Sequence, residues 1–184
     1  MDAAHRRDRR PEVGQPLTGH TFGVTGVATG VVDGRPVAVT LTGGGGMVRV
    51  WDLVTREQIG ETLSTHTGLV YGMAMGVVDG GPVAVTGSGD GTVRVWDLTT
   101  RQPIGKPLTG HTDLVCAVAT GVVDGRPVSV TGSHDETVRV WDLTTGRQVG
   151  PELVFPAAVS AVAVTPDGQL VVGFGWEVSV LTRC

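Results

Sequence analysis

Cysteine, aromatic side chains and long hydrophobic runs are all scarce in this chain of 184 residues. Its two cysteines, Cys116 and Cys184, have neither the number of a disulfide framework nor the spacing of a metal site. Cys116 stands in an apolar stretch, where a thiol behaves as a small buried hydrophobe. No apolar run approaches the ~18 residues that a membrane span requires. We therefore expect no disulfide-rich secreted domain and no membrane span, and a reducing, cytoplasmic setting.

Charged residues are also few, at 17% of the chain, and the formal net charge is −4. Because there is no overall positive charge, binding to nucleic acid or to an anionic membrane is not favoured. Four arginines stand within the first ten residues, but no hydrophobic stretch follows them, so this segment is not a secretory signal. We interpret residues 1–11 as a polar, disordered arm.

The chain is instead rich in valine and glycine, and its sequence repeats with a long period. The sequence Val-Arg-Val-Trp-Asp-Leu occurs three times, beginning at Val48, Val93 and Val138, so the copies are 45 residues apart. Between the copies, valine-rich runs are separated by Asp-Gly pairs such as Asp33-Gly34, which suit type I′ hairpin turns. A period of this length predicts a series of units that each contain four short strands.

Three complete units are predicted, at about residues 20–64, 65–109 and 110–153, with a degenerate fourth at 154–184. The fourth unit has three strands and lacks the last, outer strand. Conversely, the stretch Val13–Thr18 matches Ile104–Thr109, which forms an outer strand, although no blade precedes it. Pairing Val13–Thr18 with Val178–Leu181 would cover two open sheet edges. We therefore expect an N-terminal strand that completes the last blade, within one chain or between two copies.

The Trp-Asp strands, together with Thr-Gly-His before the first and third units, resemble the WD40 repeat family from about Val13 onward. The amino-acid sequences of the repeats also resemble those of the near-identical WD40 arrays of actinobacterial signalling proteins. The family resemblance implies an all-β propeller over residues 12–184, with about four four-stranded antiparallel blades. It also implies a buried network in each blade that joins a His, a Ser or Thr, a turn Asp and the Trp. The matching residues are His66, Thr86, Asp90 and Trp96 in unit two, and His111, Thr131, Asp135 and Trp141 in unit three. Ser88 or Ser133 could supply the hydroxyl instead.

A hydroxyl, an imidazole and a carboxylate are also the components of a catalytic triad. Here, however, the set recurs with the period of the fold, whereas an active site usually occurs once, so we interpret it as structural. Unit one has Gly43–Gly46 in place of the turn Asp, so His20 lacks a carboxylate partner. We interpret this run as a loose turn and not as an anion site, because no helix or Lys follows it. Unit four has Phe155 or Pro156 near the His position, so blades one and four should be the less stable ones.

The sequence shows no metal cluster, cofactor loop or unique nucleophile, so we expect no cofactor and regard an enzyme as the least favoured hypothesis. The family resemblance implies a scaffold for protein–protein interaction. The candidate binding positions follow the histidines: Phe22, Thr67, Leu69, Tyr71, Thr112 and Asp113. Aromatic side chains often carry interface energy, but Phe22 and Tyr71 could equally pack between blades. Two further hypotheses are that the chain is the C-terminal part of a larger regulatory protein, or that two copies form a homodimer through their terminal strands. A ring of four blades would lie at the low end of the ~4–8 blades of known propellers.

Overall fold

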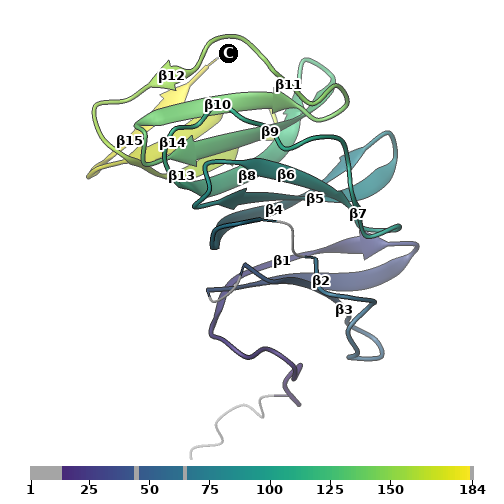
Figure 1. Cartoon of the computed structure of the whole chain (residues 1–184). Coiled ribbons are helices and arrows are strands. Elements are labelled where there is room, and N and C mark those ends of the chain that lie inside the picture. Colours follow the sequence, from purple (N-terminus) through teal and green to yellow (C-terminus); the bar gives the residue numbers. More distant parts are fainter. Residues whose placement is uncertain (1–13, 44–45, 64–65, 183–184) are drawn as a thin grey trace, which may run out of the picture.

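The computed structural model describes residues 14–43, 46–63 and 66–182, and the predicted arm at residues 1–11 lies outside them. The regular secondary structure of the described residues consists of fifteen strands in four antiparallel sheets that follow one another along the chain (Figure 1). Within these residues there is no helix, and therefore none that could cross a membrane. The predicted all-β fold class is confirmed.

Each sheet is one blade. Blade one contains β1 (Val24–Val32), β2 (Arg35–Thr42) and β3 (Val48–Asp52). Blade two contains β4 (Val70–Val78), β5 (Gly81–Ser88), β6 (Val93–Asp97) and β7 (Gln102–Pro103). Blade three contains β8 (Val115–Val123), β9 (Arg126–Ser133), β10 (Thr137–Asp142), β11 (Arg147–Gln148) and β12 (Leu153–Val154). Blade four contains β13 (Val159–Val164), β14 (Leu170–Phe174) and β15 (Glu177–Leu181).

The first two strands of blades one to three are joined by the Asp-Gly pairs noted in the sequence. Asp33 has a φ of 49° and Gly34 a φ of 75°, and the aspartates of the next two hairpins, Asp79 and Asp124, also have a φ of 49°. Positive φ at both central residues is what a type I′ turn requires, and its twist matches that of the flanking strands. These turns therefore hold the register of the strand pairs.

The outer strands are broken where the sequence predicted continuous ones. In blade three, β11 and β12 both pair with β10, and residues 149–152 between them belong to neither strand. A glycine at positive φ lies within or beside each break, at Gly60 (65°), Gly105 (68°) and Gly150 (67°). A glycine in this conformation bends the edge strand away from its neighbour, and such irregular edges discourage pairing with other chains.

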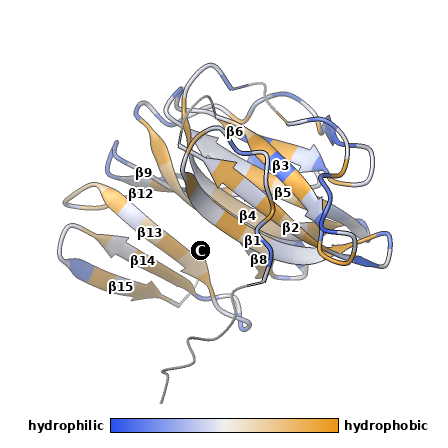
Figure 2. Cartoon of the chain, turned by 90° about the horizontal axis from the view of Figure 1, so that it is seen from below, coloured by the Kyte–Doolittle hydropathy of each residue, from blue (hydrophilic) through white to orange (hydrophobic). Residues whose placement is uncertain are grey.

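The hydrophobic core lies between the blades. Val39, Val48 and Val50 of blade one pack against Val70 and Trp96 of blade two, and the same arrangement recurs between the later blades. Figure 2 shows these hydrophobic strands in neighbouring sheets that face one another. The contacts are close: a Cβ at Gly87 of blade two would lie 2.6 Å from Val115 Cγ1 of blade three. Each of blades two and three is therefore held by two neighbours, and blades one and four by one each.

The two ends of the stack stay apart. The blade containing β1 and the blade containing β15 lie at opposite ends of the molecule in Figure 1. Residues 14–20 form no strand, and they lie beside blade one, where a Cβ at Gly19 would be 3.5 Å from Trp51 Cη2. Within one chain, therefore, the N-terminal segment does not complete the last blade as expected. The last residue of this segment, His20, is hydrogen-bonded to Thr40 of blade one. The four blades form an open arc, and β15 lies at the opposite end of this arc.

Candidate functional site

In blade three, four side chains form one hydrogen-bonded chain that runs from the core to the rim. Trp141 Nε1–H donates to Thr131 Oγ1 over 2.8 Å, and this hydroxyl donates to His111 Nε2 over 2.9 Å. His111 Nδ1 then contacts Asp135 Oδ2 at 2.9 Å. A neutral imidazole that carries its proton on Nδ1 fits this order, because Nε2 is then free to accept the hydroxyl proton. Every polar side-chain group of these four residues thus has a hydrogen-bond partner.

Blade two repeats this arrangement. The distances are 3.0 Å from Trp96 Nε1 to Thr86 Oγ1, 2.8 Å from Thr86 Oγ1 to His66 Nε2, and 3.3 Å from His66 Nδ1 to Asp90 Oδ2. The structure therefore brings together all eight residues that the family resemblance pointed to. The alternative hydroxyl, that of Ser88, bonds instead to the Leu69 carbonyl oxygen over 2.9 Å. Ser133 likewise bonds to a backbone carbonyl, so the threonines hold the network position.

The turn aspartates accept further hydrogen bonds that were not predicted from the sequence. The hydroxyls of Thr92 in blade two and Thr137 in blade three each donate to Oδ1 of the local aspartate over 2.6 Å. The backbone N–H groups of Thr67 and Thr112 donate to Oδ2 over 2.9 Å in each blade. The recurrence of a Thr two residues after the turn Asp was the available sequence signal. Thr67 and Thr112, which we had considered as binding positions, thus contribute their backbones to the network.

The pKa values of both partners are shifted downward, those of the aspartates by hydrogen bonds and those of the histidines by burial. Burial opposes ionisation of Asp135, but hydrogen bonds from Thr137, Thr112 and His111 outweigh it and lower its pKa to about 2. The pKa of Asp90 is lowered by the same balance of effects. Burial lowers the pKa of His111 and outweighs the nearby carboxylate, which raises it. At neutral pH the networks therefore contain ionised aspartates and neutral imidazoles.

Nucleophilic catalysis at these networks is not supported by their geometry. Thr86 and Thr131 are 0% exposed, and each hydroxyl already accepts the indole N–H of its tryptophan. A substrate carbonyl has no access to a hydroxyl buried in this way. Cys116 is half-buried, its Sγ lies 3.0 Å from the Val159 carbonyl oxygen, and burial raises the pKa of its thiol. In the described part of the chain, no three metal-ligating side chains form a cluster.

Blade one retains only part of the network. Trp51 Nε1–H donates to Thr40 Oγ1 over 2.7 Å, and Thr40 Oγ1 lies 2.8 Å from His20 Nε2. His20 Nδ1 is buried and has no hydrogen-bond partner among the residues that the structure describes. Residues 44 and 45 of the glycine run lie outside those residues. Within the described residues, therefore, the loss of the turn aspartate leaves one imidazole nitrogen of this blade without a partner.

Blade four replaces the network with apolar contacts. Phe155, and not Pro156, takes the buried position of the histidine, and its ring lies 4.9 Å from that of Phe174. Leu181 stands in the register position of the tryptophans, opposite Leu170 as Trp51 is opposite Ala38. This blade therefore depends on packing where blades two and three use polar bonds.

The aspartate of each Trp-Asp pair has a separate structural role. Asp52 Oδ1 accepts the backbone N–H groups of Val54 and Thr55 over 2.7 and 3.0 Å, and Asp97 and Asp142 make the equivalent pairs of bonds. These bonds close the turn that leads from the third strand to the outer strand. No role for these aspartates was predicted from the sequence.

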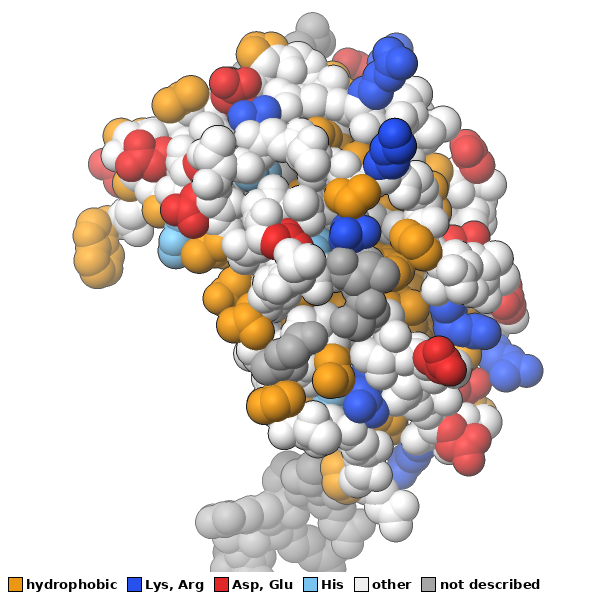
Figure 3. Space-filling view, viewed as in Figure 1, with side chains coloured by type: hydrophobic (Ala, Val, Ile, Leu, Met, Phe, Trp, Pro, Cys, Tyr) orange, Lys and Arg blue, Asp and Glu red, His pale blue; other side chains and the backbone are white. Residues whose placement is uncertain are grey.

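Apolar side chains are exposed on the rim where the first strands begin. Phe22 is 53% exposed, Tyr71 46% and Leu69 40%. Trp176, which the sequence analysis did not single out, is fully exposed in the β14–β15 turn. This turn is on the same rim, because the Gly175 N–H bonds to the Ala158 carbonyl just as the equivalent turn of blade two bonds to Leu69. Figure 3 shows hydrophobic side chains exposed along the left-hand side of the molecule.

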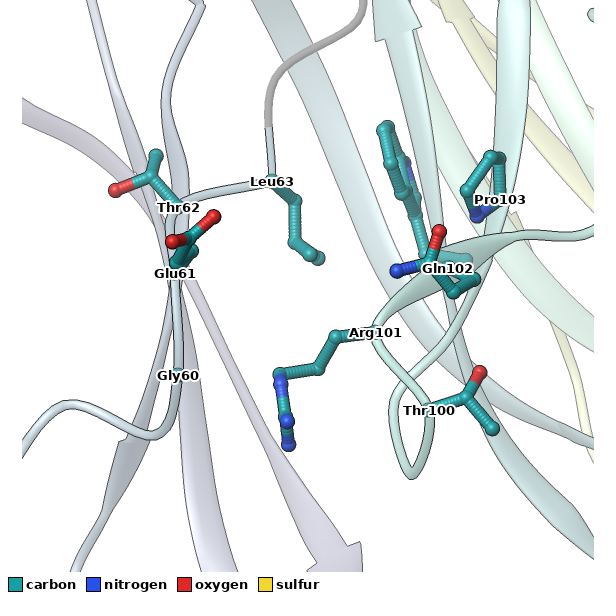
Figure 4. A pocket seen from close by; sticks show the side chains of 9 residues that line it. Gly60, Glu61, Thr62, Leu63, Thr100, Arg101, Gln102 and Pro103 are labelled. Atoms are coloured by element: carbon teal, nitrogen blue, oxygen red, sulfur yellow. The ribbon is translucent and has the colours of Figure 1, made fainter.

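A groove separates the outer segment of blade one from blade two, and that of blade two from blade three. Between blades one and two it encloses about 380 Å³, with Gly60–Leu63 on one side and Thr100–Pro103 on the other (Figure 4). The Arg101 side chain extends into this gap and packs against Gly60. A groove of similar volume recurs between Ile104–Leu108 and Leu143–Arg147. Because the groove repeats with the blades, it is a property of the fold and does not mark one binding site.

The geometry agrees with the comparison to known families. The WD40 family model, described as WD domain, G-beta repeat, matches residues 12–52, 57–97 and 101–142. These matches cover more than half of the chain, and the chain belongs to the WD40 repeat family. Members of this family are typically non-catalytic propellers that serve as protein-interaction scaffolds. No curated protein matches the chain.

Solved structures agree on the fold. The chain is similar to U3-55K with a TM-score of 0.75 and 22% identity, covering 89% of this chain and 50% of U3-55K. It is similar to the WD40 β-propeller domain of Doa1 with a TM-score of 0.73 and 21% identity, covering 89% of this chain and 52% of that domain. Against the computationally designed Ika4 protein the TM-score is 0.73 and the identity 27%, covering 94% of this chain and 100% of Ika4. The chain thus spans about half the length of the U3-55K chain and of the Doa1 propeller domain.

Proposed function

We propose that this chain is a non-catalytic regulatory or signalling scaffold that binds a protein partner through the apolar side chains of one rim. The observation that carries this proposal is the exposure of Phe22, Leu69, Tyr71 and Trp176 on a rigid rim. The loop before Leu69 and Tyr71 is held by Asp90, which accepts the Thr67 N–H. Aromatic side chains held in place in this way lose little entropy on binding and often supply most of the interface energy.

The test is an affinity capture from a cell extract with matched variants. Leu69→Ser/Tyr71→Ser should lose a protein that the parent chain retains, because both side chains lie on the rim. Val77→Ser is the control, since Val77 is 61% exposed on the same strand, β4, but near its other end. If both variants retain the same proteins as the parent, the rim is not the binding surface.

A cytoplasmic location is part of this proposal, on the sequence grounds given above. An origin in a bacterial WD40 array is also part of this proposal, and the near-identical sequences of the units support it. A second candidate is that the chain forms part of a longer repeat protein. The observation that favours it is that the chain spans about half the length of U3-55K. Reading the coding sequence upstream of Met1 for in-frame repeats tests this candidate.

A further inference from the structure

Blade four exposes valines whose counterparts in the other blades are buried. The register places Val178 opposite Gly173, as Val48 is opposite Leu41, so Val178 corresponds to Val48. Val178 is 71% exposed, and its counterparts in blades one, two and three are 1%, 0% and 0% exposed. Val180 is 58% exposed, whereas its counterparts Val50, Val95 and Val140 are 1%, 5% and 4% exposed. These two valines form the open face of blade four.

Blade one has a different open face, on its other side. Val24 is 48% exposed, and its counterparts Val70, Val115 and Val159 are 1%, 0% and 0% exposed. Leu53 is 40% exposed, whereas its counterparts Leu98 and Leu143 are 1% and 4% exposed. Val24 and Leu53 thus mark the open face of blade one.

The two open faces are the two halves of a contact that the chain already makes three times. Between blades one and two, Val48 and Val50 share a cluster with Val70 and Leu98. Between blades two and three, Val93 and Val95 share a cluster with Val115 and Leu143, and blades three and four pack in the same way. The open face of blade four corresponds to the face that presents Val48 and Val50 in this contact. The open face of blade one corresponds to the face that presents Val70 and Leu98. The two open faces are therefore complementary in shape and in chemistry.

The backbone at the two ends is complementary as well. Among the described residues, β15 pairs with β14 alone, whereas Val93 in the equivalent strand exchanges two hydrogen bonds with Leu108 of the outer segment. The N-terminal stretch has the same order of residues as that outer segment, with Leu17 in the place of Leu108. Leu17 of another copy could therefore pair with Val178 as Leu108 pairs with Val93.

We propose that two copies of this chain associate head to tail, with blade four of each on blade one of the other, and close one eight-bladed ring. A head-to-tail contact closes into a ring when the rotation at each contact fits. The arc superposes on about half the length of the U3-55K chain and of the Doa1 propeller-domain chain, with TM-scores of 0.75 and 0.73, so its curvature is that of part of a larger structure. Eight blades also lie within the usual range of ~4–8 for propellers. This proposal goes beyond the scaffold function and does not depend on it.

The first test is the mass of the chain in solution, measured by light scattering during size-exclusion chromatography. The parent chain should have twice the 19.0 kDa chain mass. Val24→Lys and Val178→Lys should each elute at the single-chain mass, because a lysine would be buried at both contacts. Val122→Lys is the control and should stay dimeric, since Val122 is 59% exposed although blade three has neighbours on both sides. All three valines are exposed in the single chain, so the lysines should leave folding intact, which tryptophan fluorescence can verify.

The second test mixes the two defective variants. A pair made of one Val24→Lys chain and one Val178→Lys chain retains one unaltered contact, so mixing should restore a complex of twice the chain mass. A parent chain that elutes at the single-chain mass at every concentration would overturn the proposal, and so would a Val24→Lys variant that remains dimeric. Open filaments would overturn the closed ring. A monomeric parent that still captures a protein through the rim would refute the ring and leave the scaffold function standing.

Discussion

At the scale of single residues, the turn aspartate decides how completely each network is satisfied. In blade two Asp90 accepts hydrogen bonds from His66, Thr67 and Thr92, whereas the histidine of blade one, His20, has a buried nitrogen without a partner in the described residues. Removing the carboxylate should therefore convert blade two to the condition of blade one. We expect Asp90→Ala to lower the free energy of unfolding by about 1–3 kcal/mol, because a buried imidazole nitrogen loses its partner.

Chemical denaturation of this variant and of Glu61→Ala measures the effect. Glu61 is exposed, so its removal should change the free energy of unfolding by no more than about 0.5 kcal/mol. If Asp90→Ala is as stable as the parent chain, the network does not stabilise the blade.

The same networks predict that acid destabilises the fold. Burial lowers the pKa values of His66 and His111 below the ordinary 6.5, so the unfolded chain binds more protons than the folded chain as pH falls below this value. The histidine contribution to stability is thus complete above about pH 6.5 and decreases below it. A second decrease begins below about pH 3.8, where Asp90 and Asp135 become protonated in the unfolded chain but stay ionised in the folded one.

Thermal unfolding between about pH 8 and pH 5 checks this expectation. The midpoint should be level above neutrality and should decrease as the pH falls below about 6.5. His111→Phe, which copies the Phe155 of blade four, should be less stable overall but should show a smaller dependence on pH in this range. A midpoint that rises on acidification would mean that the folded histidines are protonated more readily than the unfolded ones.

At the scale of the elements, the turn after the third strand contains a conformational mismatch. Arg56 and Arg101 have φ values of 64° and 60°, and the third blade has Gly146 at 66° in the same position. A left-handed conformation costs a non-glycine residue about 1–2 kcal/mol, whereas glycine adopts it freely. We expect Arg56→Gly to raise the free energy of unfolding by about 0.5–1 kcal/mol, because the greater freedom of glycine in the unfolded chain offsets part of the gain.

Thermal unfolding of Arg56→Gly and Arg56→Ala separates the backbone effect from the side-chain effect. Alanine removes the guanidinium but keeps the unfavourable φ, so this control should be no more stable than the parent chain. A glycine variant that unfolds at a lower temperature would show that the contacts of the Arg56 side chain contribute more than the backbone strain removes.

The elements also show which features could be predicted from the sequence. The strands and hairpins follow from the Val alternation and the Asp-Gly pairs, and the network partners follow from the period of the repeats. The interrupted outer strands did not follow, because a period does not reveal where a glycine such as Gly150 leaves the sheet. The exposure of Trp176 and Val178 was not predictable either, because it depends on which neighbouring blades are present and on a unit that departs from the repeat.

At the scale of the whole molecule, each blade contacts only the blades beside it, so stability should vary along the stack. In the single-chain variant Val178→Lys, both end blades have an uncovered face, and neither contains a complete network. We expect the backbone amides of β2 and β14 to exchange hydrogen faster than those of β5 and β9, as mass spectrometry of labelled peptides would measure. In the parent dimer the end faces would be covered, so this difference should become smaller. Equal exchange rates in all four blades of the variant would mean that the arc unfolds as one cooperative unit, in which case covering the end faces would stabilise every blade alike.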